Sequence, residues 1–116
     1  MRVSKTKINQ NLGKTILKNF IQTLDDLKNF DEKRAFITDF FNKNELETYS
    51  KRLAIFYYLK KRRSYENIKT NLKVSSATIA VLEKQIEKEG IKLALKKMEA
   101  DEWANVWSEK IKKITS

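Results

Sequence analysis

The sequence predicts an all-α protein, and two observations support this fold class. The chain of 116 residues contains no proline and only two glycines, so it has few residues that break helices or form the turns of a sheet. Apolar residues recur at intervals of three and four along most of the chain, which is the spacing of amphipathic helices. The length suits one domain with its own core, and we expect residues 1–116 to form a single helical domain.

Three helices are expected in the first half of the chain. The first covers about residues 8–27, where the apolar side chains form a broad stripe. Asp31 is the predicted N-cap of the second helix, "EKRAFITDFF". A third helix, about residues 43–62, follows Asn42, and Glu45 stands three positions later as in a capping box. Because apolar residues cover much of its circumference, we expect this third helix to lie centrally.

Two short helices and a longer terminal segment are expected in the second half. Ser64 caps a helix that ends near Leu72, and either Ser75 or Ser76 caps the next. That second short helix is expected to run to about residue 89, where Gly90 would stop it.

The terminal segment "IKLALKKMEADEWANVWSEKIKKI" is amphipathic and forms one helix, or two broken near Asp101. Trp103 and Trp107 are interpreted as core residues, with exposed anchors for a partner as the alternative.

Composition excludes several functional classes. The chain has neither cysteine nor histidine, which excludes disulfides, thiol catalysis and zinc fingers, and we expect no metal and no cofactor. No glycine-rich phosphate loop is present and the 15 carboxylates are scattered among lysines, so we do not expect an enzyme. Neither a membrane-spanning apolar run nor a signal peptide is evident, and we expect a cytoplasmic protein without membrane association. The net charge of +10 favours a polyanionic partner.

The joint between the two short helices has the spacing of a helix-turn-helix. That motif needs two apolar residues in its first helix, one in the turn and two in its second helix. Ile68, Leu72, Val74, Ile79 and Leu82 fill these five positions. The second helix can then project into a groove of DNA.

The outward side of the second short helix is small and polar. Ser76, Ala77, Ala80 and Lys84 fall within a sector of roughly 100°, opposite the apolar residues. Small side chains let a helix enter the major groove deeply, and their methyl groups can contact thymine methyls.

Basic residues gather at the same place. Between residues 51 and 74 eight basic residues face one acid, Glu66, giving this window a charge of +7. Such a run alone usually marks a solvated face of a bundle, and its coincidence with a helix-turn-helix favours DNA binding. One position departs from the motif: the first turn residue, often a glycine with a left-handed backbone, is Lys73, at a cost of about 1 kcal/mol.

Two stretches resemble the Trp repressor superfamily. They are "FFNKNELETYSKRLAIFYYLKK" and "SYENIKTNLKVSSATIAVL", which match in the "NEL" cap, the "KRL" of the central helix, the serine that opens the short helix and the "SSATIA" of the recognition helix. The similarity covers about residues 40–86. It implies an intertwined homodimer that regulates transcription, with dimerising helices at about 5–62 and 91–114 and the helix-turn-helix at about 64–89.

The resemblance also assigns roles to individual residues. It implies backbone contacts from Ser64, Tyr65 and Lys69, and base contacts from Ser76, Ala77 and Ala80, with Thr78 nearby. The family's tryptophan ligand lies between two arginines, of which one matches Arg52 and the other falls on Val81. A buried carboxylate without its second charge partner is unfavourable, so we expect that tryptophan is not the effector, and the effector stays unknown. Arg52 is interpreted as a surface cation or a partner of Glu45 or Glu47.

The sequence therefore predicts a sequence-preferring regulator of transcription, a repressor, that binds double-stranded DNA as a homodimer. Two alternatives stay open: a helical module that binds protein or RNA, and an architectural or mobile-element protein that binds DNA without strong sequence preference. The expected DNA contacts are Arg62, Arg63, Ser64, Tyr65, Lys69, Lys73, Ser75, Ser76, Ala77, Thr78, Ala80 and Lys84.

Overall fold

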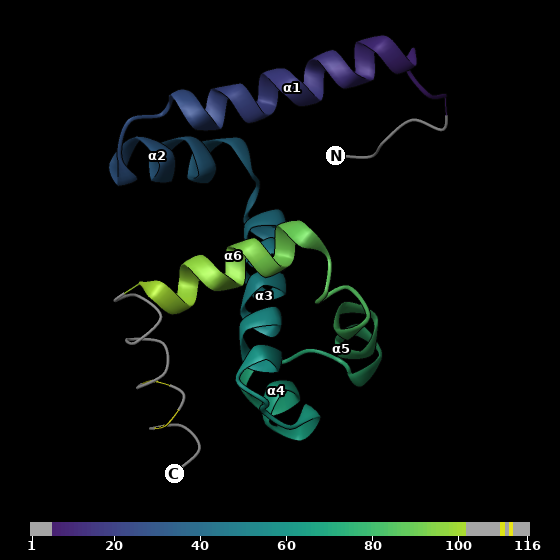
Figure 1. Ribbon diagram of the computed structural model, residues 1–116, viewed down its shortest axis with the longest axis vertical. Helices are drawn as coiled ribbons and strands as arrows, with labels where there is room; N and C mark the ends of the chain where they lie inside the picture. The colour runs from purple at the N-terminus through teal and green to yellow at the C-terminus, as the bar shows by residue number, and fades with distance from the viewer. Residues whose placement is uncertain (1–5, 102–109, 111, 113–116) are drawn as a thin grey trace. The chain divides into compact units, whose positions relative to one another are not determined.

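The computed structural model describes residues 6–101, 110 and 112, and within them the chain forms helices and no strand, which confirms the all-α prediction. The helices are α1 (Gln10–Asp26), α2 (Phe30–Phe40), α3 (Lys43–Lys60), α4 (Tyr65–Leu72), α5 (Ser76–Glu83) and α6 (Glu89–Ala100) (Figure 1). Two compact units divide the chain, residues 1–46 and 47–116. None of the described helices is long and apolar enough to cross a membrane.

The start of α2 differs from the prediction. Asn29, not Asp31, is the N-cap: its Oδ1 accepts a hydrogen bond from the Glu32 amide at 2.9 Å. The Glu32 carboxylate in turn accepts from the Lys28 amide at 2.9 Å. Asn29 is favoured as the N-cap because Glu32 then stands three residues later, where its carboxylate can accept a hydrogen bond from a backbone amide before the helix. Asp31 lies in the first turn, where the helix dipole also favours a carboxylate.

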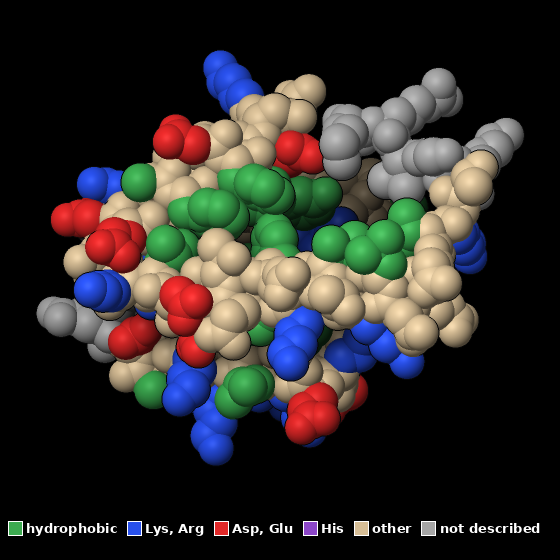
Figure 2. Space-filling view, turned by 90° about the horizontal axis from the view of Figure 1, so that it is seen from above, with side chains coloured by type: hydrophobic (Ala, Val, Ile, Leu, Met, Phe, Trp, Pro, Cys, Tyr) green, Lys and Arg blue, Asp and Glu red, His purple; other side chains and the backbone are tan. Residues whose placement is uncertain are grey.

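The first unit has aromatic contacts but no buried residue among its described residues, 6–46. The Phe40 ring lies 5.5 Å from the Phe20 ring and 5.1 Å from the Phe36 ring, so these side chains join α1 to α2. Neither helix buries any residue, however. Figure 2 shows hydrophobic side chains on the surface of the molecule. Seven large apolar side chains of this unit are more than half exposed, namely Ile8, Leu12, Ile16, Leu17, Ile21, Phe30 and Phe40.

The start of α3 confirms the predicted capping box. The Glu45 amide donates to Asn42 Oδ1 at 2.8 Å, and the Asn42 amide donates to Glu45 Oε1 at 2.9 Å. Each side chain thus satisfies a backbone amide that the helix itself leaves unpaired.

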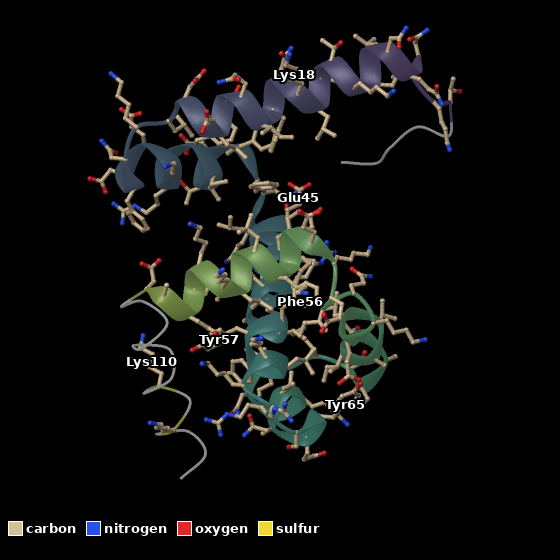
Figure 3. The ribbon with its side chains drawn as sticks, in the orientation of Figure 1. Lys18, Glu45, Phe56, Tyr57, Tyr65 and Lys110 are labelled. Carbon is tan, nitrogen blue, oxygen red and sulfur yellow. The ribbon has the colours of Figure 1, made fainter. Side chains whose placement is uncertain are left out.

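The second unit is built around the C-terminal half of α3, as expected of the central helix. Residues 54–58 are all buried, and the side chains of Phe56 and Tyr57 leave α3 on different sides (Figure 3). The buried residues of α4, α5 and α6 pack in the same core, namely Ile68, Ile79, Leu82, Leu95 and Met98. These contacts hold α4 and α5 against α3.

The second short helix ends earlier than predicted. α5 stops at Glu83, because the chain then changes to tighter bonds between residues three apart, such as Gln85 N to Leu82 O at 2.8 Å. The prediction that Gly90 stops this helix is wrong: Gly90 lies inside the first turn of α6 and does not have a positive φ. α6 ends at Ala100 with Asp101 as its C-cap, near the predicted break, and Trp103 and Trp107 lie outside the described residues.

Candidate nucleic-acid interface

The helices α4 and α5 form the predicted helix-turn-helix. Ile68 and Ile79 are fully buried, and Leu82 is 6% exposed. Leu72 and Val74 are partly buried and pack against the same cluster. All five apolar positions that the motif requires therefore face the core, and the opposite side of α5 is left for a ligand.

Serines cap both helices, and Lys73 makes the turn. Ser64 Oγ accepts from the Asn67 amide, and Ser75 Oγ accepts from the Thr78 amide, each at 3.1 Å. The structure thus selects Ser75 over Ser76 as the second cap. Lys73 has φ 56° and ψ 53°, which confirms the left-handed backbone expected at this position. Its amide donates to the Lys69 carbonyl at 2.9 Å and closes α4.

The side chains on the outward side of α5 are short and uncharged at the N-terminal end of the helix. Ser76, Ala77 and Thr78 are exposed, and Ala80 is half-buried. The Thr78 hydroxyl is hydrogen-bonded to Ser75 Oγ at 2.9 Å, so these two hydroxyls partly satisfy each other. Lys84 is exposed, but it is the C-cap residue that follows α5 and not part of the helix as predicted.

The predicted basic residues differ in exposure. Arg62, Lys69 and Lys73 are exposed, as a phosphate contact requires. Arg62 has φ 60°, the second left-handed non-glycine residue among those described, and it ends α3 with bonds from Arg62 N to Leu59 O and from Arg63 N to Tyr58 O. These bonds form a Schellman motif, although no glycine stands at this position to signal it.

Arg63 departs from the expectation of an open phosphate contact. It is half-buried, and its Nε is a buried atom without a hydrogen-bond partner. The side chain therefore folds back onto the protein. Burial raises the pKa of the Tyr58 hydroxyl, and the positive charge of Arg63 acts against that rise.

Tyr65 is joined to a residue that sequence reasoning did not single out. Its hydroxyl donates to Glu83 Oε1 at 2.5 Å, across 18 positions of the chain, from the first residue of α4 to the last of α5. The hydrogen bond to Glu83, helped by burial, raises the pKa of Tyr65. The helix-turn-helix spacing is the signal that could have revealed this pair. In that motif the two helices cross, which brings the start of α4 near the end of α5.

A cavity of about 530 Å³ lies between α3 and α5 in the second unit. It is lined by residues of α3, the turn and α5, together with Gln85, namely Thr48, Lys51, Arg52, Ile55, Val74, Ala77, Thr78, Val81, Leu82 and Gln85. Arg52 and Val81, which the resemblance placed on either side of the family's ligand, thus line one cavity. The cavity borders the recognition helix directly, so a molecule bound there would contact α5.

The two cations of this cavity already have partners. Lys51 Nζ lies 3.2 Å from the Glu47 carboxylate. Arg52 is exposed, as expected of a surface cation, and its guanidinium lies 5.3 Å from the centre of the Tyr49 ring in a cation–π contact. With valine at position 81, the cavity has no second arginine opposite Arg52.

Comparison with known proteins identifies one family. A family model described as Trp repressor protein matches residues 15–99, which include α2 to α5, most of α1 and most of α6. No curated protein and no solved structure matches the chain.

Proposed function

The chain belongs to the Trp repressor family, a family of helix-turn-helix DNA-binding regulators, and from this premise we propose that it is a homodimeric repressor of transcription. It acts on double-stranded DNA in the cytoplasm, with α5 in the major groove. The observation that carries the proposal is that α5 presents small, uncharged side chains on the outward side of its N-terminal end, and that exposed cations precede and follow the helix in the chain.

Phosphate contacts supply most of the affinity in this proposal. Arg62, Lys69, Lys73 and Lys84 are exposed and lie between the end of α3 and the residue after α5. Each such cation that approaches a phosphate releases counterions, which makes binding strongly dependent on salt. Arg63 contributes less, because its side chain folds back onto the protein.

Base reading comes from Ser76 and Ala77, with Thr78 and Ala80 beside them. None of these side chains can make the two-point contacts to guanine or adenine that arginine, asparagine and glutamine make. The Thr78 hydroxyl is also engaged by Ser75. Specificity is therefore modest, and the shape and deformability of DNA supply a share of it.

A second copy of the chain covers the apolar side chains of the first unit. Neither α1 nor α2 has a buried residue, and Leu17 is 61% exposed while Ile21 is 56% exposed. Apolar area of this extent on one helical unit is typical of an interface. Two copies would place two recognition helices on DNA, as expected for the family.

The effector of this protein is not tryptophan. The amino acid's carboxylate needs strong cationic partners when it is removed from water. Here Arg52 is stacked on Tyr49, Lys51 is paired with Glu47, and Val81 has no charge.

The proposal is tested by selecting duplexes from a random pool with the purified full-length protein at about 0.15 M salt. Sequencing the bound pool should give a two-fold symmetric motif whose half-sites are about one helical turn apart. Retention without enrichment would contradict a sequence-preferring repressor and favour a charge-driven DNA coat. No retention would overturn DNA binding and favour a helical module that binds protein or RNA.

A further inference from the structure

An acidic side chain stands on the recognition helix, on the side assigned to DNA. Glu83 is the only acidic residue in the α5 sequence SATIAVLE. It follows Ser76 by seven positions, which is about two helical turns, so the two residues share one side of α5. When α5 binds DNA, a carboxylate at this position that extends toward the phosphates is repelled by them, which weakens binding. The position of Glu83 therefore needs an explanation if α5 binds DNA.

The Tyr65 hydroxyl restrains this carboxylate. It donates to Glu83 Oε1 at 2.5 Å, which is a short hydrogen bond. The Tyr65 ring is partly buried and packs against the core cluster, so the hydroxyl has a fixed position at the start of α4, where Figure 3 labels it. The donor is a neutral phenol, so this bond restrains the carboxylate without adding a positive charge to the end of α5.

The same bond joins the two helices of the motif. The turn at Lys73 joins the last residue of α4 to the first of α5, whereas Tyr65 and Glu83 lie at the two ends that the turn leaves open. The bond therefore adds a second link between the two helices, at the ends opposite the turn. Apolar packing also joins α4 to α5. Among the described residues, the Tyr65–Glu83 bond is the one side-chain hydrogen bond between these two helices.

We propose that Tyr65 is a positioning residue for DNA binding, whose hydroxyl holds the Glu83 carboxylate against α4 and away from the phosphates. This inference rests on the proposed function, because it concerns the same surface of α5. It assigns to Tyr65 a role through Glu83, in place of the direct phosphate contact that the sequence predicted. It also explains how a recognition helix tolerates an acid on its outward side.

The test uses full-length variants and one labelled duplex, bound at about 0.15 M salt. Tyr65→Phe keeps the ring and removes the hydroxyl, so it frees the carboxylate and should weaken binding about fivefold per protomer. Glu83→Gln removes the charge and should bind as tightly as the original protein or more tightly. The double variant Tyr65→Phe/Glu83→Gln should return to within about twofold of Glu83→Gln.

A matched control separates this rescue from a general effect of charge. Glu66 is an exposed carboxylate on α4, next to Tyr65 in the sequence. Tyr65→Phe/Glu66→Gln therefore removes one negative charge from the same motif but leaves Glu83 ionised. It should stay as weak as Tyr65→Phe.

Several results would overturn the inference. They are full-strength binding by Tyr65→Phe, failure of Glu83→Gln to rescue it, and equal rescue by Glu66→Gln. Urea unfolding of each variant shows whether a loss of binding follows a loss of stability, and rescue by Glu83→Gln without recovered stability supports the positioning role. If the unaltered protein does not bind the duplex, the proposed function itself fails, which distinguishes that outcome from a failure of this inference alone.

Discussion

The salt dependence of DNA binding can be predicted from the exposed cations of the helix-turn-helix. Each protomer has four such cations, namely Arg62, Lys69, Lys73 and Lys84. Arg63 is not counted, because it is partly buried. A dimer then neutralises about eight phosphates, and log K should fall with log salt at a slope of about −7. Between about 50 and 200 mM salt the affinity should drop roughly 10⁴-fold. Lys69→Ala removes one contact from each protomer and should reduce the slope to about −5.

Fluorescence anisotropy with a labelled duplex, measured over a salt series, gives this slope directly. Lys33→Ala is the matched control, because Lys33 is an exposed lysine on α2 in the other unit of the chain. The control should leave the slope unchanged, and Lys69→Ala should weaken binding to all sequences alike. A slope near zero for the unaltered protein would refute the reasoning. So would an equal change of slope in the two lysine variants.

Three further predictions concern the core, the dimer and the effector. Ile79→Ala removes a fully buried side chain and should lower the free energy of unfolding by about 2–5 kcal/mol, measured by urea denaturation followed by circular dichroism. Leu17→Lys combined with Ile21→Lys places charges on the exposed side of α1 and should convert a dimer to a monomer in sedimentation equilibrium; an unchanged mass would contradict the assigned interface. Calorimetry should detect no binding of tryptophan to the unaltered protein, whereas Val81→Arg supplies a cation opposite Arg52 and should create measurable binding.

Local patterns in the sequence were sufficient for much of the fold. The capping box of Asn42 and Glu45 depends only on residues three apart, and it forms as predicted. The apolar spacing of the helix-turn-helix was predictable because both helices must bury the same side to close the motif. The left-handed turn at Lys73 followed from the motif and not from the residue, since lysine alone favours a right-handed backbone.

Other features depend on choices that neighbouring residues do not settle. Asn29 and Asp31 are both good N-caps, and the return bond from Glu32 decides between them. The early end of α5 depends on tighter turns after Glu83, for which no proline or glycine gives a local signal.

Contacts between residues far apart in the chain could not be predicted from patterns in the sequence. Tyr65 and Glu83 are 18 positions apart, so their hydrogen bond needs the crossing of two helices before it can be anticipated. The half-buried position of Arg63 likewise depends on how the folded chain packs, although its place in a basic run suggested an exposed cation. For the candidate interface, the sequence predicted which residues surround α5 but not which of them are already engaged within the protein.

The most direct test of the central claim places a carboxylate on the outward side of α5. Ala80→Glu should abolish binding to a duplex while changing the free energy of unfolding by less than about 1 kcal/mol, because phosphates repel the new charge. Ser76→Glu provides a second variant in the first turn of the helix, where a carboxylate suits the helix dipole. Ala100→Glu carries the same charge on an exposed residue at the end of α6 and should bind normally. If both α5 variants bind as tightly as Ala100→Glu, α5 does not enter the major groove and the account is wrong.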